Sequence, residues 1–216
     1  MPRRVFETIH LTALGLWLGA VIATGVFAAI VFGATRELDP TVPAFSVYEG
    51  SHADLIAGFV QNRVFAAVDV IQFVCGFLAL ASLIGLLTLG KLPLNRWSSG
   101  LRIVGVAGAM GLLSFYLLVL TPRMTENVQL YWSAAQAGEA ENAARYKAAF
   151  DADHPAASNA LKGVAASLAL AMISGTLSAV SGTSGATTMT QARRPTPKQA
   201  KPTLEEPELA KLGAKR

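Results

Sequence analysis

Charge is scarce in this sequence, and cysteine is almost absent. Asp, Glu, Lys and Arg make up 15% of the 216 residues, whereas hydrophobic types make up 52%. Soluble domains carry about 25% charged residues, so the composition excludes an ordinary soluble domain and favours a membrane protein. Cys75 is the single cysteine. An intrachain disulfide is therefore impossible, and Cys75 is expected to be a small packing residue.

The motifs of the common enzyme classes are also missing. The sequence contains no nucleophile elbow, metal-binding helix pair, phosphate-binding loop or haem-attachment motif. We therefore expect no enzymatic activity and no cofactor. The three histidines, His10, His52 and His154, fall at opposite ends of the predicted spans, which argues against a paired-histidine haem. Basic residues are not interleaved with stacking aromatics, so a nucleic-acid partner is not expected.

Four long apolar runs dominate what the sequence does contain. They cover residues 11–34, 64–89, 103–120 and 163–180. A bilayer core of ~30 Å needs about 20 helical residues, so each run is long enough to cross a membrane. The sequence predicts an all-α membrane protein, a four-transmembrane-helix bundle in contact with the lipid bilayer. The predicted spans within a domain of residues 1–182 are about 5–34, 64–89, 103–121 and 162–181.

The two ends of the chain need separate interpretations. Arg3 and Arg4 resemble the basic region of a signal peptide, but the following apolar run is about twice as long as the ~7–15 residues of a signal sequence. We therefore expect a retained first span. Residues 183–216 have no aromatic residue and are rich in Ser, Thr, Gly, Pro and Lys. This composition predicts a disordered basic cytoplasmic tail.

Basic residues gather on one side of the predicted spans. In the tail they outnumber acidic residues seven to three, and the connections at 35–57 and 122–160 are acidic. On the same side, Arg3 and Arg4 precede the first span, and Lys91, Arg96 and Arg102 fill the short connection between the second and third spans. Because short cytoplasmic loops are rich in Lys and Arg, we expect both termini in the cytoplasm. The predicted location is a multi-pass protein of a bacterial-type plasma membrane.

Local signals predict where the helices begin and end. Ser51 is a candidate N-cap for a helix that starts at His52 and runs into the second span. Pro122 is expected to mark the boundary that closes the third span. The connection between the third and fourth spans is predicted to be an external helical hairpin or an extension of the third span. Residues 151–155 are expected to form a loop, and Ser158 or Asn159 to cap the fourth span.

Two small groups of titratable residues invite a chemical interpretation. Glu7 and His10 are three residues apart and share a helical face at interfacial depth. They are either a proton-handling or ligand-binding pair, or an interfacial pair that caps the first span. Asp151, Asp153 and His154 have the chemistry of metal ligands, but no second cluster supports them. We therefore expect no metal.

Small residues recur at four-residue spacing on two of the predicted spans. This pattern lets neighbouring membrane helices approach closely. The predicted helix-packing positions are Gly15, Gly19, Gly163, Ser167, Ala171 and Gly175, with Ala179 continuing the second ridge. The ridges serve either a tight bundle or the docking of a membrane-protein partner or a second copy of the chain.

Asp69 is the charged residue nearest to the middle of a predicted span. If the bilayer core covers residues 70–89, Asp69 lies at its outer edge, where the cost of the charge is small. If the core starts at Val64, the carboxylate lies about 8 Å inside by helix rise and needs a partner. Arg123 and Lys162 are the candidate partners. Gln72 is on the same face and extends the polar strip inward.

Several short motifs resemble the transmembrane-protein-205-like family. They are Gly58-Phe59-Val60-Gln61-Asn62-Arg63-Val64-Phe65, Thr121-Pro122-Arg123-Met124, Phe150 with His154-Pro155-Ala156-Ala157-Ser158-Asn159, and the start of the first span from His10 to Gly19 with Trp17. The resemblance covers about residues 5–182. It implies a four-helix integral membrane domain whose activity is not established across the family. The long basic tail departs from that pattern.

The polar residues of these motifs support a functional hypothesis. In the predicted topology they gather with Asp69 at the outer ends of three spans. An outward-facing pocket that binds or moves a small molecule or ion is the leading hypothesis. Its predicted ligand-binding residues are Gln61, Arg63, Asp69, Gln72, Arg123, His154 and Asn159. The alternative is a structural or partner-binding scaffold that uses the small-residue helix faces.

Overall fold

The structure, a computed structural model, describes residues 2–192, with side chains as far as Ser178. The described part is helical throughout and contains no strand. The elements are α1 (Pro2–Leu38), η1 (Pro43–Phe45), α2 (His52–Thr88), α3 (Trp97–Phe115), the π-helical η2 (Tyr116–Leu120), α4 (Thr121–Ala137) and α5 (Ala140–Ala192). The chain divides into a unit of Met1–Ser181, which holds the bundle, and a second unit of Gly182–Arg216.

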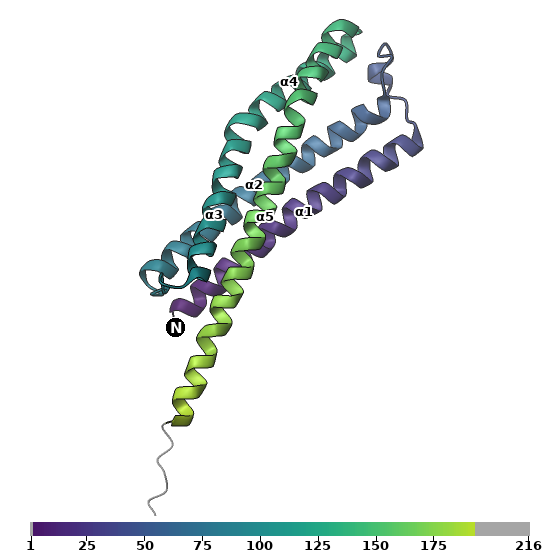
Figure 1. Cartoon of the computed structure of the whole chain (residues 1–216). Coiled ribbons are helices and arrows are strands. Elements are labelled where there is room, and N and C mark those ends of the chain that lie inside the picture. The colour runs from purple at the N-terminus through teal and green to yellow at the C-terminus, as the bar shows by residue number, and fades with distance from the viewer. Residues whose placement is uncertain (1, 193–216) are drawn as a thin grey trace, which may run out of the picture. The chain divides into compact units, whose positions relative to one another are not determined.

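The predicted fold class is confirmed. Four helical stretches are long and apolar enough to cross a membrane, namely Pro2–Leu38, His52–Thr88, Trp97–Ala137 and Ala140–Ser178. The chain is an integral, multi-pass membrane protein in contact with lipid. Figure 1 shows the N-terminus and the α2–α3 connection at one end of the bundle, which we call the N-terminal end. The α1–α2 connection and the α4–α5 turn form the opposite, hairpin end.

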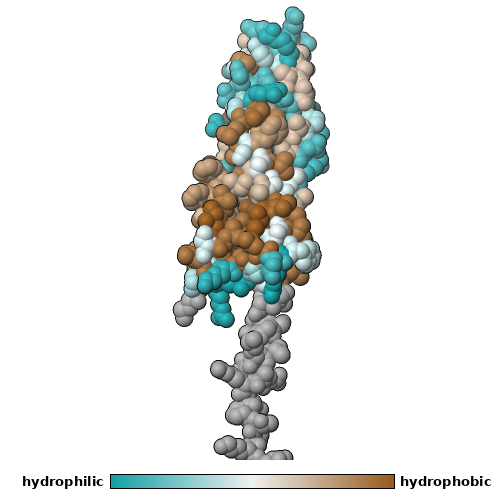
Figure 2. Space-filling model, turned by 60° about the vertical axis from the view of Figure 1, so that its left-hand side comes forward, coloured by the Kyte–Doolittle hydropathy of each residue, from teal (hydrophilic) through white to brown (hydrophobic). Residues whose placement is uncertain are grey.

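The helices extend well past the predicted spans. With 37 residues each, α1 and α2 are about 55 Å long, against ~30 Å for a bilayer core. Figure 2 shows a hydrophobic band between two hydrophilic ends on the face in view. The four apolar runs mark this band because apolar side chains face the lipid. Beyond the band the same helices continue into water, where their residues are polar. The tail was predicted for residues 183–216, but α5 continues to Ala192, so residues 183–192 are helical. Residues 193–216 lie outside the described residues.

Two helix ends follow from capping chemistry. Ser51 caps α2 as predicted, and its hydroxyl accepts a hydrogen bond of 3.1 Å from the backbone N–H of Asp54. Helix α4 ends at Gly138, which adopts the left-handed conformation with φ of 74°. Only glycine adopts this conformation without steric cost, and it lets α5 begin at Ala140.

Neither of two prolines interrupts the helix: at Pro122 the predicted extension of the third span is confirmed, and the loop expected at residues 151–155 is wrong. Pro122 lies in the first turn of α4, directly after the π-helical turn of η2. The wider π-turn removes the need for the hydrogen bond that proline cannot donate. Pro155 lies inside α5, so residues 151–155 form no loop and neither Ser158 nor Asn159 caps a helix. Helix α5 runs through them because its packing outweighs the local cost of one proline.

Glycines on α2 make room for large side chains of α1. A Cβ atom at Gly85 would lie 2.5 Å from the Phe6 ring, and one at Gly76 would lie 3.3 Å from the Trp17 ring. Both aromatic rings therefore lie directly against the α2 backbone. Trp17 is fully buried, so it belongs to the core rather than to the lipid-facing surface.

The small residues of α5 pack against α3. A Cβ atom at Gly105 would lie 2.7 Å from the carbonyl oxygen of Ser167 and 2.9 Å from the backbone nitrogen of Ala171. Gly163 receives Leu112, and Gly175 receives the Arg102 side chain. On α1, Gly15 faces Met172, whereas nothing lies within 4 Å of a Cβ atom at Gly19. The side chain of Ala179 lies outside the described ones.

The hairpin end has a small hydrophobic core of its own. Its buried members are Leu55, Val128, Tyr131, Ala134, Ala135 and Ala143, and Phe45 and Tyr48 from the α1–α2 connection pack on them. The hydroxyl groups of Tyr48 and Tyr131 are hydrogen-bonded at 2.7 Å. His52 accepts a hydrogen bond from the Val42 backbone N–H with Nδ1, and its Nε2–H donates to the carbonyl of Tyr48. These contacts fix the connection over the helical hairpin.

The contact between α3 and α5 gives a first prediction. Gly105→Ala should lower the thermal unfolding midpoint in detergent, because its methyl group would overlap the α5 backbone. Gly111→Ala is the matched control, since nothing lies within 4 Å of a Cβ atom there and alanine favours a helix over glycine by about 1 kcal/mol. Equal midpoints for the two variants would show that α3 and α5 are not in close contact.

Candidate functional site

A charged pair is buried at the N-terminal end of the bundle. Arg102 on α3 is 0% exposed, and its two Nη atoms donate to the two carboxylate oxygens of Glu7 on α1, at 3.1 and 2.5 Å. A buried guanidinium requires such a partner because an unpaired charge there is very costly. The α5 backbone closes the site, since a Cβ atom at Gly175 would lie 3.3 Å from the guanidinium carbon.

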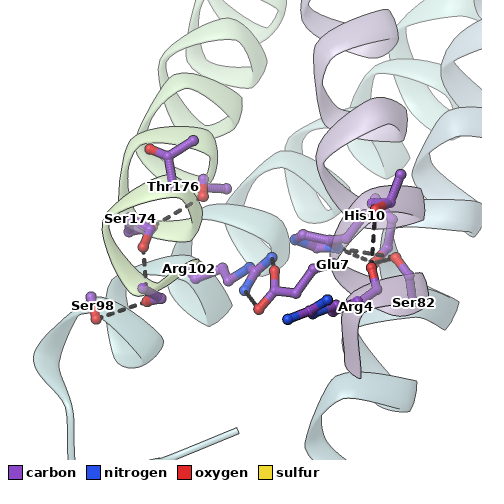
Figure 3. Close-up of polar contacts among 12 residues, drawn as sticks. Arg4, Glu7, His10, Ser82, Ser98, Arg102, Ser174 and Thr176 are labelled. Carbon is purple, nitrogen blue, oxygen red and sulfur yellow. Dashed lines mark hydrogen bonds and ion pairs between the residues drawn. The ribbon is translucent and has the colours of Figure 1, made fainter. Parts of the chain in front are cut away.

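His10 lies one helical turn beyond Glu7 and is 0% exposed. Its Nδ1 is 2.9 Å from the carbonyl oxygen of Ala79 and 3.1 Å from the hydroxyl of Ser82. A carbonyl only accepts, so Nδ1 carries the hydrogen and Nε2 keeps a lone pair in the neutral ring. Nε2 has no partner among the described residues. In Figure 3 this end of the imidazole points toward Arg102.

Two further polar atoms of this region are also buried without a described partner. They are Nε of Arg102 and the hydroxyl of Ser99, which lie three residues apart on α3. Buried polar groups in proteins are nearly always hydrogen-bonded, so these atoms are available to a further hydrogen-bonding partner. We call Glu7, His10, Ser82 and Arg102 the N-terminal polar layer.

The sequence interpretation missed Arg102 as a member of this layer. It counted Arg102 among the basic residues of the α2–α3 connection, which in fact ends before Trp97. The available signal was position: a helix starting at Trp97 carries Arg102 into its second turn, where the side chain faces the bundle. Glu7 and His10 were identified as a pair, but their partners are 95 and 72 residues away in sequence.

A second group of polar side chains begins at Trp17, which lies about 10 Å from His10 along α1 by helix rise. The indole N–H of Trp17 donates to the amide oxygen of Gln72 at 3.2 Å. The amide nitrogen of Gln72 donates to the carboxylate of Asp69, also at 3.2 Å. The buried Tyr116, where η2 begins, lies close enough to Asp69 to interact with its charge. We call Trp17, Asp69, Gln72 and Tyr116 the middle polar layer.

An apolar layer separates the two polar layers. Each helix contributes a buried residue between its polar positions: Leu14 on α1, Cys75 on α2 and Val106 on α3. Leu168 on α5 belongs to the same hydrophobic core. The bundle therefore has polar groups at two depths with closely packed hydrocarbon between them, and the described arrangement contains no continuous polar path.

The carboxylate of Asp69 has no cationic side chain beside it in the described part of the chain. No basic side chain among the described residues forms an ion pair with it. Arg123, one of the two expected partners, instead pairs with Asp153 of α5 at 2.7 Å. Among the described side chains, Gln72 is the one that donates to the carboxylate. Asp69 is half-buried.

The remaining predicted ligand-binding residues are not gathered around Asp69. Gln61 is buried on the core-facing side of α2, and neither atom of its amide has a described partner. Arg63 is exposed and lies over the Phe59 ring. His154 is exposed beside the Phe150 ring, and Asn159 is exposed. Gln61, Asp69 and Gln72 therefore lie within or beside the bundle core, whereas Arg63, Arg123, His154 and Asn159 lie on its surface.

A hollow of about 350 Å³ lies at the hairpin end, between the α1–α2 connection and the turn at Gly138. Residues from both sides line it, among them Tyr48, Glu49, Tyr131 and Lys147. None of the predicted ligand-binding residues lines it. The described part of the chain holds no group of three or more residues placed to bind a metal ion.

Comparison with known proteins adds no relative. No family model matches the chain, and no curated protein or solved structure is similar to it.

The buried pair gives a second prediction. Glu7→Gln leaves the Arg102 guanidinium without its counter-charge, and breaking a buried pair from one side costs about 3–5 kcal/mol. The thermal unfolding midpoint in detergent should therefore fall strongly. Arg36→Gln is the control, because the Arg36 side chain is 65% exposed in its pair with Asp54 and surface pairs contribute about 0–1 kcal/mol. A Glu7→Gln midpoint no lower than that of Arg36→Gln would contradict a buried pair.

Proposed function

We propose that this protein binds a small cation between its spanning helices and moves it across the membrane, the proton being the simplest candidate. The observation that carries the proposal is the carboxylate of Asp69. It belongs to a membrane-spanning helix, it is half-buried, and no described basic residue neutralises it. Ionisable residues in such positions are costly, and they commonly mark ion pathways and proton relays.

The surroundings of Asp69 support this proposal. Gln72 holds the carboxylate by an amide hydrogen bond, which orients it without neutralising its charge. The π-helical turn at Tyr116–Leu120 begins beside it, and single π-turns are frequent at functional sites. Gln61, on the same face of α2 as Gln72, offers an unpaired amide toward the hairpin end. Asp69, Gln72 and Gln61 replace the larger pocket predicted from the sequence, because the other predicted ligand-binding residues lie on the surface of the bundle.

The scaffold alternative has less support. Its main docking ridge on α5 lies against α3 and Arg102 inside the bundle, through Gly163, Ser167, Ala171 and Gly175. Of the predicted packing positions, Gly19 has open space beside it. A partner helix or second copy would have to use that face of α1.

We also retain the family and the topology as proposals. The four-helix architecture agrees with the resemblance to the transmembrane-protein-205-like family. The basic residues Lys91 and Arg96, which remain in the α2–α3 connection, favour a cytoplasmic N-terminal end. The middle polar layer would then be reached from the outer side, and a bacterial-type plasma membrane would be its location.

Asp69→Asn tests the proposed function. The full-length protein is reconstituted in liposomes with a pH-sensitive dye inside, and a potassium gradient with valinomycin drives proton entry. Wild type should acidify the interior faster than protein-free liposomes, and Asp69→Asn should abolish this excess because the amide cannot carry a proton. Asp151→Asn removes an exposed carboxylate of the hairpin end and should behave as wild type. Equal rates for wild type and Asp69→Asn would rule out proton transport through Asp69.

A further inference from the structure

The N-terminal polar layer holds one carboxylate and two groups able to neutralise it. Arg102 occupies both oxygens of Glu7, whereas His10 has a lone pair on Nε2 and no described partner for it. Glu7 and Arg102 both lie close enough to His10 to interact with its charge. A single buried carboxylate neutralises a single cation well, so Arg102 and a protonated His10 are competitors for Glu7.

We infer that His10 is a second proton-binding site, in which proton uptake at Nε2 displaces Arg102 from Glu7. The inference rests on the proposed function and identifies the proton as the transported or coupling ion. In the step, a hydronium ion transfers a proton to Nε2. One O–H bond breaks, one N–H bond forms, and the positive charge moves onto the imidazole. The imidazolium then replaces the guanidinium as the cation next to Glu7.

The groups around His10 are consistent with this exchange. On α1, Glu7 is the nearby carboxylate and Arg4, one turn earlier, is exposed. On α2, Ala79 and Ser82 hold Nδ1 and therefore keep Nε2 directed away from α2, toward Arg102 (Figure 3). On α3, Arg102 and Ser99 carry the remaining orphaned atoms. On α5, Gly175 lies beside Arg102 and brings no charge.

The displacement of Arg102 would also change how α3 packs against α5. The guanidinium and Nε lie 3.3 Å from where a Cβ atom of Gly175 would be, so α5 leaves little free space around them. A guanidinium that leaves Glu7 has to move along α5 or push it away from α3. Proton binding at His10 is thereby coupled to the α3–α5 contact that closes this end of the bundle.

Nitrogen NMR of the full-length protein in lipid nanodiscs, with labelled histidine and arginine, tests the inference directly. His10→Asn assigns the His10 signals. Because a buried histidine beside a guanidinium takes up a proton only in acid, the pH is lowered from about 8 to about 3.5, and Nε2 of His10 should change from unprotonated to protonated. The Nη signals of Arg102 should change over the same interval. An Nε2 that stays unprotonated, or an Arg102 that does not respond, overturns the inference.

Proton flux provides the second measurement. In His10→Asn the side-chain amide can still donate to the Ala79 carbonyl, but it has no atom that takes up a proton. Flux should fall to the rate of protein-free liposomes. His52→Asn is the matched control, because it removes an imidazole from the hairpin end and leaves an oxygen to accept from the Val42 N–H. If His10→Asn shows wild-type flux while Asp69→Asn shows none, His10 is ruled out as a proton-binding site in transport. The proposed function is then unaffected. Absence of proton flux in the wild type overturns proton transport by this protein, and with it this inference.

Discussion

The buried guanidinium of Arg102 constrains the N-terminal end of the bundle more than any other group. A charge removed from water has to be paired and hydrogen-bonded, and Glu7 meets both needs with two parallel hydrogen bonds. This requirement fixes the height of α1 relative to α3. It also explains why position 175 is glycine, because the planar guanidinium lies against the α5 backbone. The need to pair one buried charge thus sets the register of α1, α3 and α5.

Close packing of the helix backbones supplies the attraction between helices that the hydrophobic effect cannot supply within a bilayer. Lipid tails are as apolar as leucine, so helices in a bilayer associate through close contact and polar bonds. Gly105 against Ser167 and Ala171, and Gly85 against Phe6, are contacts in which even a methyl group has no room. Between these contacts, His10 bonds to α2, Trp17 to Gln72 and Ser178 to Ser98. Each hydrogen bond joins two spans and is protected from competing water.

The sequence predicted the features that depend on lipid as a solvent, and it missed those that depend on distant neighbours. Four apolar runs gave four spans, and the cap at Ser51 was correct because capping is local. The extension of the third span through Pro122 was one of two predicted alternatives, whereas the helix through Pro155 was not predicted, since the packing of α5 outweighs local preference. Arg102 was assigned to a connection because its partner, Glu7, is 95 residues away. The pairing of Arg123 with Asp153 rather than Asp69 depends on the rotation of α5, which no local pattern specifies.

The two polar layers differ in how their charges are balanced, and this difference sets what each can do. In the N-terminal layer Glu7 and Arg102 neutralise each other, so an added proton has to displace an existing partner. In the middle layer Asp69 has an amide for a partner, so a cation can bind there without displacing one. The packed layer of Leu14, Cys75, Val106 and Leu168 prevents direct passage between the two. The proposed transport would therefore require movement of a helix, and the π-turn at Tyr116–Leu120 begins close to Asp69.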